Sequence, residues 1–508
     1  MPDLGLNFPI YRKYHFLILA LFFWGASLGV IMLFFLAGRT EYLNIYFLAV
    51  LLLALTVSPM VFSSIRRKFD VFEPIHLISI MIAVSFALRA LYLVADFGQP
   101  LPVQIGPYFY QDFIPQALGY VILGYLALMG GYYLDFAVKF AKILPSLKLK
   151  WPTYAQPNKV ALIFVIGLLA IFYQINQGKV AGADPAYSSQ VAETTFIILS
   201  FLQFPLYAAG IAIIYIFRRQ ASFWLKLLFG CAIVPTVLAE TFIFGGKSFV
   251  FLVIFATAAA YNYVRRRISL PQLIFGGIIL AILIFPFVNT YRGEILAPIR
   301  GGGPGITEVI DDLGYTLDYI SSSNFPSYFQ RAIGMLSMRF HGIDSLALII
   351  KFPSETKAFN FAFDYLLIPA YALVPRLFWP DKPLPHATGF GRAFVLPSDI
   401  SSSSYTSFGM FHIGDLYINF GPLGIVIGMF ILGIAYRLVY SYLKPASEPE
   451  PSRIFLYIFI IWCMVNGFEG EIAQLCSTLI KTVIFILGIA WLFKRRNSKY
   501  GNLLKKVQ

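Results

Sequence analysis

The chain has 508 residues, of which 58% are hydrophobic and 13% are charged, and its mean hydropathy is +0.74. Soluble globular chains contain roughly 45–50% apolar and about 25% charged residues, so this composition excludes a water-soluble particle and predicts an integral membrane protein. The formal net charge of +14 gives no reason to expect nucleic acid as a partner, because most lysines and arginines lie in short segments beside apolar runs.

Twelve apolar runs have close to the ~20 residues that a transmembrane helix needs. In chain order they are 14–37, 42–63, 76–96, 113–136, 159–175, 194–217, 225–244, 249–264, 271–290, 412–436, 454–469 and 471–493. The first run is too long for the core of a signal peptide and no small-residue cleavage site follows it, so we expect an uncleaved first helix. The predicted fold class is an all-α polytopic membrane protein.

Seven basic segments lie between or beside these runs: 12–13, 66–68, 139–159, 218–226, 265–267, 437–453 and 494–506. If the helices simply alternate in direction, all seven segments lie on one side of the membrane. Cytoplasmic segments carry an excess of lysine and arginine, so both termini and the basic tail 494–508 are expected in the cytoplasm. Residues 1–290 would then hold nine helices, and residues 412–493 would hold the last three.

One long segment, residues 291–411, separates the ninth run from the tenth and is expected on the extracytoplasmic side. A loop of this length is uncommon without a function. Residues 306–320 and 329–351 carry apolar residues at helical spacing and predict short helices. Residues 359–374 are apolar but contain an aspartate and a proline, which indicates a re-entrant or interfacial element.

Isolated cations occur beside aromatic residues and glycines in this outer segment, and the densest group lies in residues 374–383. Three prolines restrict this backbone, and Trp379 suits the membrane–water interface. Arg376 and Lys382 would then lie near the headgroups, where a guanidinium can hold phosphate oxygens in a bidentate contact. The alternative is an interfacial turn whose cations only touch lipid phosphates.

Three more cations are candidates. Lys247 lies in the outer turn before the run 249–264, and Arg292 directly follows the ninth run. The Gly-Lys-Ser around Lys247 is not the Walker A motif of nucleotide-binding proteins, because Thr241 stands where the first glycine should be and the turn is expected to face outward. Snorkelling is the alternative for both. Arg89 lies inside the run 76–96, and a charge there marks a functional site by default, with an internal ion pair as the alternative.

His341 follows Arg339 by two residues and precedes Asp344 by three, so the imidazole and the carboxylate share a helix face. This pattern fits a base that a carboxylate orients, or a surface hydrogen bond. The sequence has no cysteine or histidine cluster with the spacing of a metal site, and no Asp-x-Asp in the outer segment, so neither a metal nor another cofactor is predicted. The pair Gly424-x-x-x-Gly428 predicts close helix packing.

Several of these elements together resemble bacterial oligosaccharide repeat-unit polymerases, the Wzy family. Residues 375–383 match an element of that family, P-x-x-x-W-P-x-[KR]-P, and are followed by a serine-rich loop and a helix that opens with residues 414–421. The turn 245–248 is similar to the family's Gly-Gly-x-[RKS] turn, and the polar loop 182–193 occupies a similar place. The number of runs, their orientation and the late outer segment also match, so the resemblance covers most of the chain.

The resemblance implies a metal-independent glycosyltransferase of GT-C-like architecture in the bacterial inner membrane. Such an enzyme transfers a growing glycan from undecaprenyl diphosphate onto the terminal sugar of an incoming lipid-linked repeat unit. It works at the outer face, surrounded by membrane lipid and often beside a chain-length regulator. The alternatives are an O-antigen-ligase-type transferase and a transporter or flippase of lipid-linked oligosaccharide.

The resemblance also implies roles for individual residues. Outer arginines of this family hold the donor diphosphate, and the matching cations are Arg89, Lys247, Arg292, Arg339, Arg376 and Lys382. Arg89 would reach the diphosphate from inside the membrane. The acceptor hydroxyl needs a base, and the candidates are His341, Glu294 and Asp415.

Overall fold

The computed structural model describes residues 42–96, 111–145, 151–176, 201–243, 247–280, 340–351, 409–444 and 450–493, with Phe287 and Gly314 and without residues 67 and 153. These residues form helices, and none of them forms a strand. Within these described ranges, seven helices are long and apolar enough to cross a membrane, and three more apolar helices are shorter. The chain is therefore an all-helical membrane protein, as its composition predicts.

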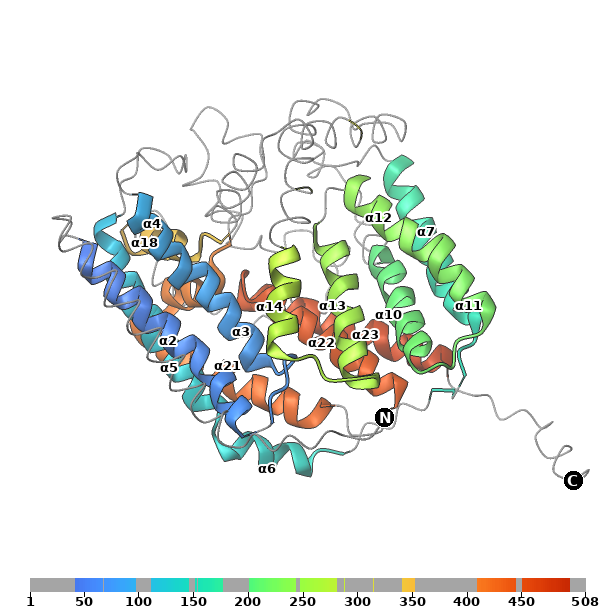
Figure 1. Cartoon of the computed structure of the whole chain (residues 1–508), viewed down its shortest axis with the longest axis horizontal. Helices are drawn as coiled ribbons and strands as arrows, with labels where there is room; N and C mark the ends of the chain where they lie inside the picture. The colour runs from blue at the N-terminus through green and yellow to red at the C-terminus, as the bar shows by residue number, and fades with distance from the viewer. Residues whose placement is uncertain are drawn as a thin grey trace, which may run out of the picture.

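The helices follow one another in a simple order (Figure 1). They are α2 (Leu43–Ile65), α3 (Pro74–Ile82), η2 (Ala83–Leu88), α4 (Arg89–Asp96), η3 (Gln111–Phe113), α5 (Ile114–Tyr132), α6 (Asp135–Ile143), α7 (Pro157–Asn176), η4 (Phe201–Gln203), α10 (Phe204–Phe217), α11 (Phe223–Leu228), η5 (Phe229–Ile233), α12 (Val234–Ile243), α13 (Lys247–Val264), α14 (Leu270–Ile279), α18 (Gly342–Lys351), α21 (Phe411–Leu443), α22 (Pro451–Gly467) and α23 (Ile472–Phe493).

Every predicted span from 42–63 onward contains at least one of these helices. The first predicted span, 14–37, lies outside the described residues, so the count of twelve stays a prediction. The predicted elements 306–320 and 359–374 also lie outside the described part, apart from Gly314. Of the predicted helix 329–351, residues 340–351 are described: α18 begins at Gly342, and Phe340 and His341 before it are not helical, so the prediction of one continuous helix through His341 was wrong.

Helix α10 lies at the centre of the packing. Every residue from Phe204 to Tyr215 is buried, and a helix that is apolar on all sides is typical of the middle of a bundle. Its neighbours α7, α13 and α22 pack around it.

One end of the helices, which we call the basic end, holds the α2–α3 connection, α6 and the last turn of α21 (Figure 1). Distant segments meet there: the Tyr215 hydroxyl donates to the Pro152 carbonyl at 2.7 Å, and the Lys159 ammonium donates to the Leu492 carbonyl at 2.7 Å. Among the described lysines and arginines, those away from this end are Arg89, Lys247, Lys351 and Lys481. The predicted clustering of the basic connections at one end is therefore present.

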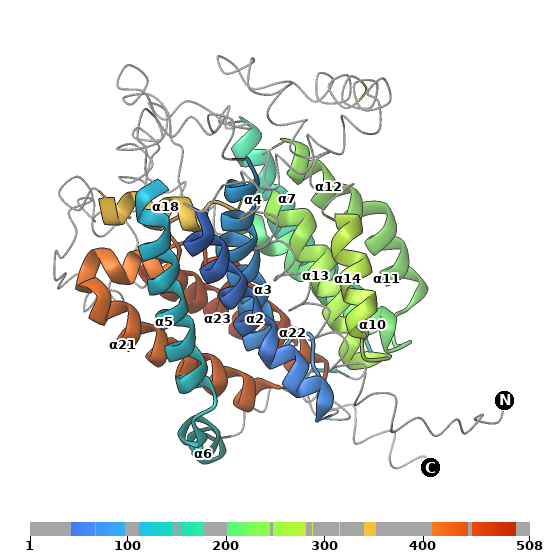
Figure 2. The same ribbon diagram turned by 60° about the vertical axis from the view of Figure 1, so that its left-hand side comes forward.

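The opposite end, which we call the α18 end, holds α4, α18, the start of α21 and the turn between α22 and α23 (Figure 2). Two backbone bonds join the last two of these parts: the Phe411 N–H donates to the Glu469 carbonyl at 2.9 Å, and the His412 N–H to the Phe468 carbonyl at 3.2 Å. The described parts of the segment 291–411 pack at this end.

Helices α5 and α21 cross at glycines. A Cβ on Gly131 would meet the Phe430 backbone, and a Cβ on Gly433 would meet the Leu128 carbonyl. Two helix backbones approach this closely only where neither carries a side chain at the crossing.

Helix α21 is broken at Gly421, where φ is 66° and ψ is −161°, and Pro422 follows. The predicted span 412–436 was expected to be continuous, but its first ten residues form a separate segment that folds back on the second. Gly424 faces Phe420 and Gly428 faces Leu416. The Gly424-x-x-x-Gly428 pair therefore does allow close packing, within its own broken helix.

Helix α6 was not predicted. The span 113–136 ends earlier, at Tyr132, and α6 lies across the basic end (Figure 1). Ala137 and Ala141 are buried, while Phe136 and Phe140 stack on each other in exposed positions. An amphipathic helix with exposed aromatic residues and lysines is typical of the membrane interface.

Candidate functional site

The α18 end contains a buried ion pair. Arg89 begins α4 directly after the π-helix η2, and the Asp344 carboxylate lies in the first turn of α18. The Arg89 Nε donates to Asp344 Oδ2 at 2.9 Å and its NH2 donates to Oδ1 at 3.1 Å, with side-chain exposures of 1% and 0%. Two parallel charge-assisted bonds of this kind are among the stronger contacts in proteins. The pair fastens α18 to α4.

The sequence left two interpretations of Arg89: a contact with substrate, or an internal ion pair. The ion pair that the sequence left as an alternative exists. A direct contact between Arg89 and a donor diphosphate stays a prediction, and it requires Arg89 to share or exchange Asp344. The sequence offered Asp344 either as the group that orients His341 or as its partner in a surface hydrogen bond; Asp344 is buried and accepts two hydrogen bonds from Arg89, so it does not lie at the surface, and its role toward His341 stays a prediction.

His341 lies just before α18, beside Gly409. The Ser345 hydroxyl accounts for this position, because it lies 3.1 Å from the His341 carbonyl and 2.9 Å from the Gly409 carbonyl. A Cβ built on Gly409 would lie 3.7 Å from His341 Nε2 and 3.0 Å from the Glu469 carbonyl oxygen. The His341 imidazole therefore lies next to the turn between α22 and α23.

The backbone after Gly409 is strained. Phe411 adopts φ 56°, a left-handed conformation that is a clear outlier for a bulky residue. Its ring is 1% exposed and packs edge-on against Phe86 at 5.1 Å and Phe468 at 6.1 Å. Such strain persists only where the surroundings enforce it, and it is often found at functional sites.

His412 was missed by the sequence analysis. The Nδ1–H of its ring donates to the Gly470 carbonyl at 3.0 Å, which leaves Nε2 as the basic nitrogen in this tautomer. Nε2 is buried and has no hydrogen-bond partner among the described residues. The sequence could have indicated it, because His412 stands two residues before Gly414-Asp415, where the helix that resembles the Wzy family begins.

Asp415 lies on the same segment of α21 and accepts a hydrogen bond from the first residue of α23. Its Oδ2 accepts the backbone N–H of Ile472, the first residue of α23, at 2.9 Å, and its Oδ1 accepts from Asn419 at 3.0 Å. A carboxylate at a helix N-terminus satisfies a free N–H and is favoured by the helix dipole. This contact is structural, and the predicted role of Asp415 as a base stays a prediction.

The structure thus brings Arg89, His341 and Asp415 to one end through α18, Gly409 and the α22–α23 turn. Lys247 is the first residue of α13, and its side chain lies outside the described part. The other candidate site residues also lie outside it: Arg292, Glu294, Arg339, Arg376 and Lys382. In the described ranges, no group of three or more histidine, cysteine, aspartate or glutamate residues could hold a metal ion.

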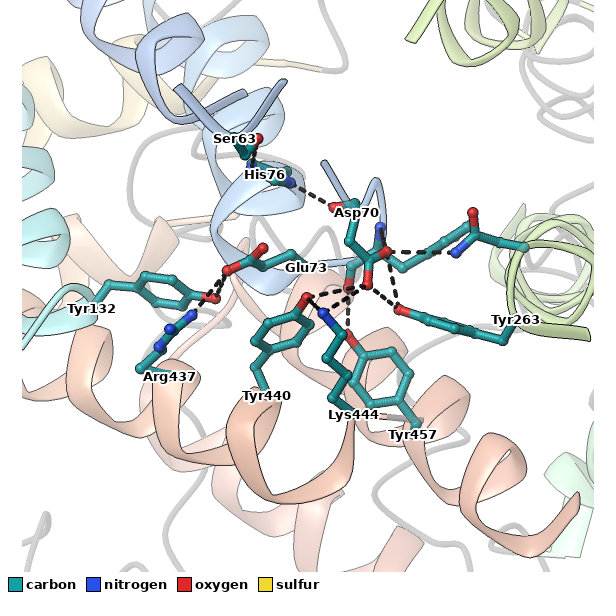
Figure 3. A network of polar contacts seen from close by, with 12 residues as sticks. Ser63, Asp70, Glu73, His76, Tyr132, Tyr263, Arg437, Tyr440, Lys444 and Tyr457 are labelled. Atoms are coloured by element: carbon teal, nitrogen blue, oxygen red, sulfur yellow. Dashed lines mark hydrogen bonds and ion pairs between the residues drawn. The ribbon is translucent and has the colours of Figure 1, made fainter. Parts of the chain in front are cut away.

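A second polar cluster occupies the basic end, around two acids of the α2–α3 connection (Figure 3). Asp70 accepts hydrogen bonds from the hydroxyls of Tyr263 at 2.9 Å and Tyr440 at 3.2 Å, with the Lys444 ammonium at 4.0 Å. Its carbonyl accepts the Nδ1–H of His76 at 2.6 Å.

Glu73 completes this cluster. It accepts from the Tyr132 hydroxyl at 2.7 Å and from the Arg437 guanidinium at 3.1 Å, and the Tyr457 hydroxyl donates to the Phe72 carbonyl at 2.6 Å. The cluster joins α3, α5, α13, α21 and α22, and these contacts satisfy both acids. A satisfied polar network of this kind rigidifies a protein, so we interpret it as a structural clamp. The sequence signal was two acids inside a basic connection.

A family model described as a domain of unknown function (DUF8712) matches residues 186–443, half of the chain. The match begins before α10 and ends with α21, so it includes His341, Asp344, His412 and Asp415, whereas Arg89 precedes it. No curated protein matches the chain, and no solved structure matches it.

Proposed function

The chain belongs to the DUF8712 family, and we propose that it is a membrane glycosyltransferase that polymerises lipid-linked oligosaccharide repeat units. One observation carries the proposal. At the α18 end, a histidine whose basic nitrogen has no partner among the described residues and a buried guanidinium lie beside two described parts of the segment 291–411, residues 340–351 and 409–411. That segment holds the cations which the resemblance to Wzy polymerases assigns to the donor diphosphate.

The orientation of the reaction follows from the charges. Cytoplasmic ends are rich in lysine and arginine, and this supports our proposal that the basic end lies in the cytoplasm and the α18 end on the outer face of a bacterial inner membrane. We propose twelve spans, with both termini cytoplasmic and a GT-C-like arrangement. The substrates would then reach the site from the outer leaflet.

The chemistry requires positive charge at the leaving group. The donor leaves as undecaprenyl diphosphate, and pre-oriented cations stabilise the charge that develops on it. We assign direct contact to Arg292, Arg339 and Arg376, with Lys247 and Lys382 as further contributors. The metal-independent character that the resemblance implies is consistent with so many cations.

Arg89 receives a different role. Because its guanidinium is engaged by Asp344, we propose that it positions α18, and with it His341, rather than holding the donor alone. It is a positioning residue unless substrate displaces Asp344.

The acceptor hydroxyl must lose a proton as it attacks the donor sugar. An imidazole nitrogen that carries no proton can act as a general base, and both His341 and His412 lie at the α18 end. His412 is the better-arranged base, since its Nδ1–H is fixed by the Gly470 carbonyl. The carboxylates Glu294 and Asp415 are the remaining candidates.

A second candidate function is supported by the break in α21. Transporters also place polar groups at interrupted helices within the membrane. A flippase of lipid-linked oligosaccharide is therefore the alternative from another class, and an O-antigen-ligase-type transferase is the alternative within the same chemistry.

A deletion strain separates these functions. We expect single repeat units to accumulate on undecaprenyl diphosphate at the outer face, because polymerisation has stopped. Full-length chains that remain on the carrier lipid would identify a ligase, and single units that face the cytoplasm would identify a flippase. A second experiment complements the deletion strain with variants of Arg376. Arg376→Ala should leave single repeat units on the carrier lipid. Arg376→Lys should restore little polymer, since a point charge cannot reproduce a bidentate contact. Full polymer from Arg376→Ala at normal protein level would contradict the donor assignment.

A further inference from the structure

One carboxyl group lies buried inside a membrane-spanning helix and has no partner among the described residues. Glu240 belongs to α12, in the span Phe223–Thr241, and is 1% exposed. Neither of its carboxylate oxygens has a hydrogen-bond partner in the part of the chain that the structure describes. The sequence analysis did not single it out.

The residue points into the protein rather than toward lipid. Ile233, Val237, Glu240 and Thr241 are buried, at the spacing of one helix face, whereas Leu238 on another face is 44% exposed. Glu240 therefore occupies a position where a core residue is expected.

Helix α12 packs against α10 and α13, and α10 offers no charged group between Phe204 and Phe217. Its titratable residues are two tyrosines whose hydroxyls are engaged elsewhere. Tyr207 donates to Gln203 Oε1 at 3.2 Å, and Tyr215 donates to the Pro152 carbonyl.

The other neighbours offer no described cation either. Along α13, Tyr263 is bonded to Asp70, Tyr261 is 39% exposed, and Lys247 begins the helix with a side chain outside the described part. In the preceding helices α11 and η5, Lys226 and Cys231 are both exposed. The described surroundings of Glu240 are therefore apolar.

The helix before Glu240 is irregular. The π-helix η5 is followed by Pro235, and π-helical turns occur frequently at functional sites. The other described π-helix, η2, directly precedes Arg89. Each of the two thus precedes a buried ionisable residue in a span.

We propose that Glu240 is a proton-binding site within the membrane. An ionised carboxylate without a partner is very costly in an apolar interior, whereas the neutral acid costs far less. The carboxyl group therefore holds its proton in the resting structure. It releases that proton to water, or to a basic group of a ligand, when either reaches the space between α10, α12 and α13. Glycosyl transfer at the α18 end does not use this group, so the two proposals are tested separately.

Labelling of the full-length protein with dicyclohexylcarbodiimide, an apolar reagent for protonated carboxyl groups, tests the site. The acid proton moves to a carbodiimide nitrogen while the carboxylate oxygen adds to the central carbon, and rearrangement gives a stable N-acylurea. We expect mass spectrometry to find the adduct on Glu240 at neutral pH and less of it as the pH rises. Glu73 is the internal control and should stay unlabelled, because Arg437 and Tyr132 hold it as a paired carboxylate.

Infrared spectroscopy makes the test independent of reagent access. We expect a protonated-carboxyl band at neutral pH that shifts in D₂O and is lost in Glu240→Gln, whose thermal stability should match that of the original protein. Absence of a Glu240-dependent band would overturn the proposal. It would also be overturned if sodium ions, but not a change of pH, protected Glu240 from labelling, because the site would then hold a cation.

Discussion

Buried ionisable side chains have different surroundings in different parts of this protein. Arg89 and Asp344 form an ion pair with two hydrogen bonds, and both side chains are almost fully buried. Glu73 forms an ion pair with Arg437, which is partly exposed. Glu240 has no described partner. Removal of one member of a buried pair leaves the other charge uncompensated, so these sites respond very differently to substitution.

Replacement of Arg89 by leucine is expected to destabilise the protein by about 3–5 kcal/mol, because Asp344 would remain buried and unpaired. The double variant Arg89→Leu/Asp344→Leu should regain much of this loss. Unfolding in detergent, followed by tryptophan fluorescence, measures all three variants as a double-mutant cycle. Simple additivity of the two single losses would show that the pair does not contribute as a unit.

Replacement of His412 by glutamine tests the proposed base. Glutamine can still donate to the Gly470 carbonyl but has no basic nitrogen, so turnover per folded molecule should fall roughly 10²- to 10⁴-fold while donor binding is kept. His341→Gln is the matched variant at the same end. A loss confined to His341→Gln would return the role to His341, and no loss in either would move it to Glu294 or Asp415.

Asp415 permits a separate test. Asp415→Asn keeps an oxygen that can accept the Ile472 N–H, so stability and turnover should change little. Asp415→Ala removes this cap of α23 and should cost about 0.5–2 kcal/mol. Thermal unfolding and activity of both variants decide the role. A folded, stable Asp415→Asn variant without activity would identify Asp415 as the base instead.

At the scale of whole elements, the break in α21 is the central feature. Gly421 adopts a positive φ, and the segment before it carries the buried polar residues His412, Asp415 and Asn419. Non-helical backbone is tolerated at membrane depth only where protein covers it or a cavity lies beside it. Gly421 is buried, and the segment before it contacts α18 and the first residue of α23, so the break lies beside the polar residues of the α18 end.

The crossing of α5 and α21 should be sensitive to side-chain size. In Gly433→Leu, the new side chain would collide with the α5 backbone at Leu128, and we expect a severe loss of folded protein in size-exclusion chromatography. Gly488→Leu in α23 is the control, because no described atom lies within 4 Å of a Cβ at that glycine. Equal yields of the two variants would contradict the close crossing.

The whole molecule has two polar ends, and the polar residues at each are arranged differently. The clamp around Asp70 and Glu73 joins five helices at the basic end, whereas the α18 end combines a strained turn, a broken helix and a basic nitrogen without a described partner. A clamped end and an end with polar chemistry fit the proposed glycosyltransferase, whose reaction would take place at one membrane face.

The sidedness of the molecule can be measured directly. An alkaline phosphatase reporter is active only outside the cytoplasm, so a fusion after Ser401 should be active and a fusion after Arg266 inactive, because the basic connections remain inside. The reverse result would show that the α18 end lies in the cytoplasm, where the proposed outer-leaflet substrates could not reach it.

Composition and local pattern alone determined the class of protein and the places of its helices. The need for a lipid solvent depends on the amounts of apolar and charged residues, and a span depends on about 20 neighbouring residues. Both are local properties. The first residues of α2, α5 and α13 accordingly lie within two residues of the predicted span starts, and the basic connections meet at one end as alternation requires.

Only the tertiary structure decided which polar groups meet. Arg89 and Asp344 are separated by 255 positions in the chain, and His412 and Gly470 by 58. Whether Glu240 faces lipid or protein, and whether Gly421 breaks a span, depend on which helix faces turn inward. These outcomes arise from the packing of all helices together, and no window of the sequence contains that information.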